Sequence, residues 1–392
     1  MSEVSELPAE GLVERVRALL PQIAAAAPAA EQARKVDDTV MKGLEGTGVF
    51  RSYVPRRFGG YEIDIDTFID VGVEVGSACT STGWITTFYA EHNWLLGHFA
   101  PEAQAEIFGA QPYVLAPGAI SLNGRATPVE GGHTLSGRWP WGTGIMHADW
   151  VMVSGFVETP DRMPQARLFV APREKFGIVD TWYASGLCAT GSNDIVAEKI
   201  FVPSHMSQEL APIGSGESPG AAWLGSATYR YPMIPFLALT AAAPLVGAAR
   251  GATALFESRL GERRMFGTTT RQGEKPAAQI RLAHLLTRAR AVEDQLRSIG
   301  AAIVRWAEKG DPCPAVERAR LRLAVAHVVA DARDVVRDAA EASGATAHLS
   351  NHPLQRFLRD VHTGASHAIF DLDGAAELYG RLRLGLDASG LI

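Results

Sequence analysis

The spacing of apolar residues changes twice along this 392-residue chain, and the change limits the folds that it can adopt. Over residues 8–110, and again after residue 220, apolar residues recur every three or four positions, as on one face of an α-helix. Between Tyr113 and Pro203 they recur every second position, in short runs bounded by Gly, Pro and Asp. The sequence therefore predicts helices, then a β-domain, then helices again.

Three domains follow from this order: a helical domain over residues 1–112, a β-domain over residues 113–212 and a helical bundle over residues 213–392. Short strands spaced this closely indicate a small antiparallel barrel or sandwich. We expect them at residues 113–116, 133–139, 150–156, 167–171, 178–182 and 195–202.

The helical domains carry their own signals. Asp66 is the expected N-cap of a helix in the first domain. Residues 214–220, rich in Gly and Ser, are expected to form a flexible link or surface loop. Two long apolar stripes, over residues 282–306 and 315–343, are typical of helices that pack in a bundle and contact a second subunit.

Composition and charge narrow the function classes. The chain is 47% hydrophobic and 20% charged, as in ordinary globular proteins. Its net charge of −6 is mild and it has no basic block, which argues against nucleic acid and membranes as partners. The three cysteines are far apart, as expected in a reducing compartment. No leader-like segment is seen and no apolar run approaches the ~20 residues of a bilayer span, so we expect a cytoplasmic protein.

The stretch GRWPWGTGIMHADW, residues 137–150, interrupts a predicted strand at a Gly-Thr-Gly corner. Glycine has no Cβ, so Gly142 and Gly144 would let another molecule approach bare backbone beside the Thr143 hydroxyl. Tryptophans on either side would supply flat apolar walls. Two interpretations follow: a site for a planar, partly polar ligand touched by Thr143, or an ordinary bulged hairpin with core tryptophans.

Histidines are the candidate acid–base groups. Trp84 and His92 lie on one face of a predicted helix. His367 belongs to the last helical part of the chain, where a lone histidine is either structural or functional. A neutral imidazole can accept a phenolic proton or donate to a developing oxyanion near pH 7. The presence of Trp84, His92 and Thr143 favours the functional interpretation.

Other nucleotide and metal motifs are missing or weak. No GxGxxG fingerprint or P-loop is present, so the sequence shows no doubly wound nucleotide site. His348 and His352 have a spacing that suits a metal, but Pro353 follows directly and no carboxylate lies between them, so we expect loop histidines and no metal. Arg263 and Arg264 at a helix end either bind a phosphate or are solvated.

Several short motifs, taken in their order and spacing, resemble a known family over nearly the whole chain. GLCATGSND at residues 186–194, IFVP at 200–203 and RxxFG at 263–267 resemble the acyl-CoA dehydrogenase superfamily. Within it, WPWGTG at 139–144 and the PLQR, RD and His motifs of 353–367 look like the oxygenase components of two-component flavin monooxygenases. This resemblance implies an α+β, acyl-CoA dehydrogenase-like fold with an N-terminal helical domain, a central antiparallel β-barrel or sandwich and a C-terminal four-helix bundle.

The resemblance implies a flavin site at the Gly-Thr-Gly corner. Thr143 corresponds to the hydroxyl that contacts flavin N5, and Trp141 and Gly142 correspond to the backbone beside the flavin ring. Relatives more often have Ala-Ser or Ser-Ser where this chain has Gly142-Thr143. Threonine keeps the hydroxyl and adds a methyl group, which changes the shape of the pocket.

Further site residues are implied in the helical domains. Trp84 and His92 correspond to the helix that lines the substrate side of the pocket, and His367 to a histidine near flavin and substrate. Arg263 corresponds to an arginine that reaches the flavin phosphate or pyrophosphate of a neighbouring subunit in a tetramer. Thr346 lies where a loop of the family meets that phosphate.

The implied activity is that of an FMNH2-dependent oxygenase component that hydroxylates a small phenolic or polyketide-type aromatic through a flavin C4a-hydroperoxide. The implied cofactors are O2 and FMN, or FAD in place of FMN, and the implied partners are a separate NAD(P)H:flavin reductase and the other chains of a homotetramer. His367 or His92 would deprotonate or orient the aromatic hydroxyl. Trp84, Trp141 and Phe370 would exclude water from the flavin.

Other functions on this fold stay open at this point. An acyl-CoA dehydrogenase needs a carboxylate base, which the family places just after Arg-Asp or on the helix before RxxFG. Here the first place holds Ser366-His367-Ala368, and the second, residues 231–250, contains no Asp or Glu. These residues favour an oxygenase over a dehydrogenase. The same fold could also serve an N- or S-oxygenase or a flavin-free binding protein.

Overall fold

The computed structural model describes residues 8–158, 163–388, 390 and 392. Helices form its first part: α1 (Leu12–Ala33), α2 (Asp38–Thr47), α3 (Ile65–Ala78), α4 (Thr80–Leu96) and α5 (Pro101–Phe108). Asp37 caps α2 by accepting a hydrogen bond from the Thr39 amide. The predicted cap of α3, Asp66, is wrong, because Asp64 accepts from the Thr67 amide and Asp66 lies in the first turn.

Strands of the described residues form one seven-stranded sheet in the order β5-β6-β2-β1-β3-β4-β7. They are β1 (Gly118–Val129), β2 (Gly132–Trp139), β3 (Trp150–Val157), β4 (Gln165–Pro172), β5 (Gly177–Val179), β6 (Asp194–Pro203) and β7 (Ser207–Glu209). All pairs are antiparallel except β1 with β3, which is parallel. The α+β fold class predicted from the sequence is confirmed.

The strand predicted at residues 113–116 does not form, and the first strand begins at Gly118. The backbone at the start of β3 binds only the Leu115 carbonyl of this segment, through the Asp149 and Trp150 amides. Side chains take other backbone groups: Asn93 both donates to the Val114 carbonyl and accepts from its amide. Asp149 accepts from the Leu115 amide. Apolar alternation indicated a buried, extended segment, but it could not show that side chains take several of its backbone hydrogen bonds in place of a strand partner.

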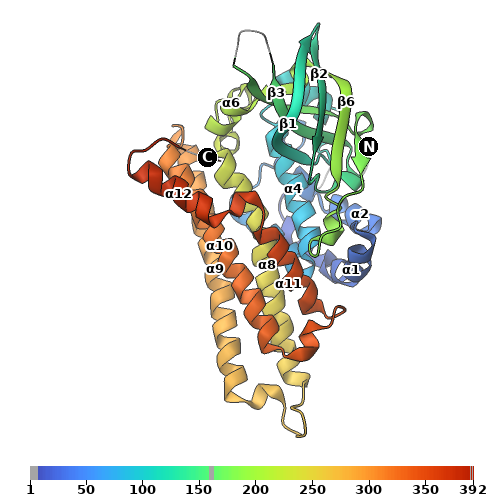
Figure 1. The fold of residues 1–392 in the computed structure, drawn as a ribbon, viewed down its shortest axis with the longest axis vertical. Helices are drawn as coiled ribbons and strands as arrows, with labels where there is room; N and C mark the ends of the chain where they lie inside the picture. Colours follow the sequence, from blue (N-terminus) through green and yellow to red (C-terminus); the bar gives the residue numbers. More distant parts are fainter. Residues whose placement is uncertain (1–7, 159–162, 389, 391) are drawn as a thin grey trace.

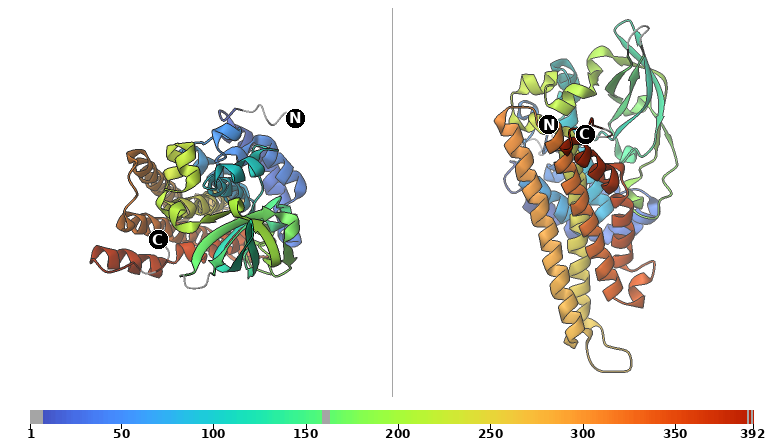
Figure 2. Two further views of the ribbon diagram at one scale, coloured as in Figure 1. Left: turned by 90° about the horizontal axis from the view of Figure 1, so that it is seen from above. Right: turned by 60° about the vertical axis from the view of Figure 1, so that its left-hand side comes forward.

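Helices again form the rest of the chain: α6 (Leu210–Ser215), α7 (Pro219–Leu224), α8 (Met233–Glu262), α9 (Pro276–Lys309), α10 (Ala315–Ala342), α11 (Pro353–Ala365) and α12 (Leu372–Arg383). The link predicted at residues 214–220 holds the end of α6 and the start of α7, which Ser218 caps. Helices α8 to α11 lie side by side as the predicted bundle, with the sheet at one end and the α8–α9 connection at the other (Figure 1). The right-hand view of Figure 2 shows the same arrangement from another side.

Helix α8 is the central element, because it contacts α3 and α4 of the first part as well as α9 and α10 of the bundle. Small residues allow this close approach: a Cβ on Gly76 would lie 2.4 Å from the Pro244 carbonyl oxygen. By length and composition α8 could span a bilayer, which corrects the expectation that no apolar run approaches this length. However, 89% of its most apolar window is buried inside the protein, so its apolar surface belongs to the core. The three domain boundaries stay a prediction.

Candidate active site

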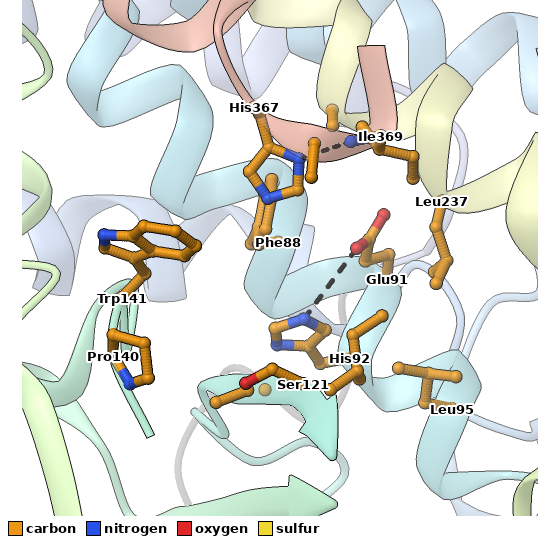
Figure 3. Close-up of a pocket in the computed structure, with 15 residues that line it drawn as sticks. Phe88, Glu91, His92, Leu95, Ser121, Pro140, Trp141, Leu237, His367 and Ile369 are labelled. Atoms are coloured by element: carbon orange, nitrogen blue, oxygen red, sulfur yellow. Dashed lines mark hydrogen bonds and ion pairs between the residues drawn. The ribbon is translucent and has the colours of Figure 1, made fainter. Parts of the chain in front are cut away.

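A cavity of about 240 Å³ lies where the sheet meets the helices (Figure 3). Its lining comes from helices α4 and α8, the start of β1, the residues after β2 and the connection between α11 and α12. The lining residues are Phe88, Glu91, His92, Leu95, Gly118, Ala119, Ile120, Ser121, Pro140, Trp141, Leu237, Ala241, His367, Ala368 and Ile369. Pockets for drug-sized ligands measure about 300–1,000 Å³, so this cavity suits a compact molecule. Most of its walls are apolar.

His92 presents a hydrogen-bond acceptor to this cavity. Its Nδ1 lies 2.7 Å from the Ala116 carbonyl oxygen, and because a carbonyl only accepts, Nδ1 carries the proton. The neutral ring therefore has a bare Nε2. Burial lowers the pKa of His92 to about 4, which keeps the ring neutral near pH 7. A Cβ on Gly118 would lie 2.9 Å from Nε2, so the glycine at the start of β1 leaves room for the ring.

His367 presents the opposite character. It caps the short helix η11 (Ala368–Phe370), and its Nδ1 accepts from the Ile369 amide at 3.2 Å. The proton of the neutral ring is therefore on Nε2, which can donate into the cavity. Desolvation by the surrounding groups lowers the pKa of His367 to about 4 as well, although part of its side chain is exposed to solvent. The two histidines named from the sequence thus line one cavity as a neutral acceptor and a neutral donor.

Aromatic rings connect the two histidines. Trp84 stacks on Phe88 with ring centroids 4.8 Å apart, and it meets His367 edge-on at 5.9 Å. Phe88 in turn meets His92 edge-on at 5.6 Å. Trp84 and Phe370 are buried and do not line the cavity, and both contact the His367 ring edge-on from outside it.

The two tryptophans of the WPWGTG motif differ. Trp139 is fully buried and donates from Nε1 to the Ser154 carbonyl, as expected of a core tryptophan. Trp141 is 63% exposed at the edge of the cavity. It has a left-handed backbone with φ of 63°, which costs about 1–3 kcal/mol in a residue other than glycine. Gly142 is held by its amide, which donates to the Asn193 carbonyl.

Thr143 is buried and belongs to a chain of hydroxyl groups. Its Oγ1 lies 3.0 Å from the Ser192 Oγ, which lies 2.7 Å from the Thr190 Oγ1. Thr190 donates its proton to the Leu187 carbonyl oxygen at 2.8 Å. Each hydroxyl has one proton, so Ser192 donates to Thr190 and Thr143 donates to Ser192. Thr143 is left with free lone pairs and can only accept from a further partner.

Sequence reasoning missed Ser192 and Thr190, although both lie in a motif that it used. It also missed Glu91, the only acidic residue of α4, which directly precedes His92. Glu91 is buried and lines the cavity. Burial raises its pKa well above the usual range of a glutamate. In the sequence, a glutamate beside a histidine shows neither which way the side chain points nor whether it is buried.

Arg263 and Thr346 lie away from this cavity, at the end of α8 opposite the sheet. Arg263 donates to the Ser343 carbonyl oxygen. Arg259, which the sequence did not indicate, donates to the Thr346 Oγ1 at 2.8 Å and contacts the His352 ring. Within the described part of the chain, no group of three or more His, Cys, Asp or Glu side chains is placed to hold a metal.

Comparisons with a family model and with curated relatives point to the same family. Residues 239–372 match the family described as "Acyl-CoA dehydrogenase, C-terminal domain". The chain is 32% identical over 379 residues to a pigment production hydroxylase of Rhodococcus sp., covering 96% of this chain and 97% of the relative. It is 33% identical over 375 residues to the flavin-dependent monooxygenase oxygenase subunit HsaA of Rhodococcus jostii, covering 95% and 98%.

Solved structures agree with these relatives. The crystal structure of 3-HSA hydroxylase from Rhodococcus sp. RHA1 matches with a TM-score of 0.92 at 32% identity, covering 97% of this chain and 98% of that one. XiaF from Streptomyces sp., in complex with FADH2 and glycerol, matches with a TM-score of 0.90 at 28% identity, covering 99% and 98%. The family inferred from the short motifs is confirmed: the chain belongs to the oxygenase components of two-component flavin-dependent monooxygenases, on the acyl-CoA dehydrogenase-like fold.

Proposed function

We propose that this chain uses reduced flavin and O2 to hydroxylate a small phenolic aromatic in the cavity of Figure 3. A separate NAD(P)H:flavin reductase would supply the reduced flavin. Relatives named as oxygenase components support both points, among them the p-hydroxyphenylacetate 3-hydroxylase of Acinetobacter baumannii, 28% identical over 386 residues. The single observation that carries the proposal is a compact apolar cavity with two neutral histidines of opposite hydrogen-bond character.

Reduced flavin fits the hydroxyl chain at Thr143. Position N5 of the flavin ring carries a hydrogen when the flavin is reduced and none when it is oxidised. Since Thr143 donates its own proton to Ser192, it can accept from N5–H but has no proton for a bare N5. Trp141 and Gly142 would hold the ring beside it. When bound, reduced flavin supplies the activation of O2, and the protein supplies position and electrostatics.

The histidines then have separate roles. We assign His92 as the acceptor of the phenolic proton, through its bare Nε2. We assign His367 as the hydrogen-bond donor that stabilises negative charge developing on an oxygen atom derived from O2, through its Nε2–H. Phe88, Leu95 and Leu237 give the cavity apolar walls that exclude water.

The phosphate of the flavin would bind at the far end of the bundle of a neighbouring subunit, in a homotetramer. Arg263 and Thr346 are the residues predicted for this role, and the structure adds Arg259 beside Thr346. The fully exposed Phe266 nearby is an apolar side chain that a second subunit would cover. FMN is the flavin that the motifs favour, whereas XiaF was solved with FADH2.

Anaerobic titration of the purified protein with FMNH2, FADH2, FMN and FAD tests this function directly. We expect tighter binding of a reduced flavin than of its oxidised form. Turnover of a panel of phenols with any flavin reductase should then give hydroxylated products that incorporate oxygen from O2. If no reduced flavin binds, the chain is a flavin-free binding protein on this fold. Oxidation of an acyl-CoA without O2 incorporation would instead identify a dehydrogenase.

A further inference from the structure

The function proposed above leaves Glu91 without a role, although it is buried in the wall of the cavity. Its Oε1 lies 3.8 Å from the His92 Nε2, beyond hydrogen-bond distance. Its Oε2 has no hydrogen-bond partner among the described residues. Figure 3 shows both side chains at the same end of the cavity, with Glu91 between His92 and His367. A buried polar side chain of this kind normally has a partner.

The protonation states of Glu91 and His92 make them complementary to a ligand group placed between them. Burial favours the neutral carboxyl of Glu91, which then carries one O–H donor. The proton of His92 is held on Nδ1 by the Ala116 carbonyl, so its Nε2 is an acceptor. The donor and the acceptor are too far apart to satisfy each other. An atom placed between them must accept one hydrogen bond and donate another.

Substrate groups can be compared by this rule. A hydroxyl both accepts and donates, so it satisfies Glu91 and His92 together. An ether or carbonyl oxygen only accepts, and it would leave His92 unpaired. Among the described residues that line the cavity there is no lysine or arginine, so a carboxylate would have no counter-charge.

We propose that Glu91 and His92 together bind the hydroxyl group of a neutral phenolic substrate, with Glu91 donating to the hydroxyl oxygen and His92 accepting the hydroxyl proton. This inference rests on the proposed function and adds to it a specificity-determining residue and a substrate charge. This role differs from that of the base of an acyl-CoA dehydrogenase, which must be an ionised carboxylate when it accepts an α-proton, whereas burial favours the neutral form of Glu91. Glu91 also lies on α4, outside both places where that family has its base.

The test measures binding to the flavin-free protein, by quenching of tryptophan fluorescence or by calorimetry. The probes are matched pairs that differ only in the hydroxyl: phenol with anisole, and naphthol with methoxynaphthalene. We expect the wild-type protein to bind each phenol at least about 10-fold more tightly than its methyl ether, since a site built for a hydroxyl strongly rejects analogues that lack it. Equal binding of the two members of each pair would overturn the proposal, as would tighter binding of benzoate or aniline.

Variants assign the preference to Glu91. Glu91→Leu, of similar size, should lose most of the preference for phenol, whereas Glu91→Gln should keep it because the amide N–H can donate. Glu45→Gln is the control: the Glu45 carboxyl is half-buried and accepts from the Tyr113 hydroxyl, but it lies outside the cavity. A Glu91→Leu protein that still prefers phenol would contradict the proposal.

Infrared difference spectroscopy gives a readout that does not depend on Glu91→Leu folding. The C=O band of a protonated carboxyl should shift when phenol binds to the wild-type protein, and not when anisole binds. Glu91→Gln should lack this band. These binding measurements contain no flavin, so they test Glu91 separately from the oxygenase function. Loss of the phenol preference with intact binding of reduced flavin would reject only the role of Glu91. A clear phenol preference without binding of reduced flavin would support the role of Glu91 and reject the oxygenase function.

Discussion

The carboxyl of Asp360 accepts a hydrogen bond from the Leu187 amide at 2.6 Å, and it thereby joins α11 to the turn beside Thr143. A second oxygen of this buried carboxyl accepts from the Ser81 hydroxyl of α4. Leu187 has a left-handed backbone with φ of 51°, and its carbonyl oxygen receives the proton of Thr190. One carboxyl thus positions the hydroxyl chain that ends at Thr143, which explains the Arg-Asp motif on α11 in structural terms.

Asp360 should make stability fall as the pH rises through its pKa. Burial raises this pKa to about 6, above the value of 3.8 for an ordinary aspartate. The folded state therefore binds the proton more tightly than the unfolded state, so the contribution of Asp360 is present below about pH 4 and is lost, by up to about 3 kcal/mol, as the pH rises to about 7. The free energy of unfolding can be measured by urea denaturation at several pH values. In Asp360→Asn it should lack the pH-dependent contribution that Asp360 makes in the wild-type protein. A difference between variant and wild type that is constant with pH would contradict this prediction.

Thr143→Val should remove the preference for reduced flavin. Valine has nearly the shape of threonine but no lone pair to accept from N5–H, and one lost hydrogen bond corresponds to about 1 kcal/mol, or 5-fold in affinity. We also expect more of the consumed reduced flavin to end as hydrogen peroxide, which a peroxide assay measures against product. Thr143→Ser is the matched control and should behave like the wild-type protein. Ser192→Ala should weaken the preference too, because it frees the Thr143 proton.

His92→Ala and His367→Ala should lose product formation by roughly 10²–10⁴-fold while reduced flavin still binds. They should differ in phenol binding, which His92→Ala weakens and His367→Ala leaves nearly unchanged, because only His92 accepts the phenolic proton. Both wild-type histidines have pKa values lowered to about 4, so their neutral forms persist down to about pH 5. The rate attributable to them should be flat between pH 6 and 8 and fall as the pH drops toward 4. A rate that falls with a pKa near 6.5 would refute the neutral state assigned to these histidines.

Arg259→Met and Arg263→Met should weaken the binding of reduced FMN or FAD by about 10-fold or more, since a hydrogen bond to a charged group contributes about 1.5–3 kcal/mol. Reduced riboflavin has no phosphate and is the matched ligand control: its binding should not change. Sedimentation of the variants shows whether subunit assembly is intact. Equal losses with riboflavin would mean that these arginines support the fold and not the phosphate.

The sequence predicted the order of structural elements well, because amphipathic period is a local property of the chain. The long helices α9 and α10 begin and end within a few residues of their predicted stripes. The strand at 113–116 failed because Asn93 and Asp149, distant in sequence, bind its backbone. The cap of α3 was displaced by two residues to Asp64, since two aspartates near one helix start offer equal local signals.

The site residues also divide into those that local sequence patterns identify and those that depend on distant contacts. Residue type and motif spacing were enough to name His92 and His367, and both line the cavity. Their hydrogen-bond characters were not in the sequence, because the Ala116 carbonyl and the Ile369 amide decide which ring nitrogen carries the proton. Glu91 was missed for a related reason: its neutral state comes from burial by segments of four other elements around α4.

The sequence alone determined the order of the helical and β regions, the family and the residue types available for flavin and acid–base chemistry. Only the tertiary structure decided which polar atoms are left without partners and which groups are neutral. Local patterns depend on neighbours within a few residues, whereas protonation depends on desolvation and on donors from distant parts of the chain. The direction of the hydroxyl chain at Thr143 and the unpaired carboxyl of Glu91 are therefore properties of the assembled fold.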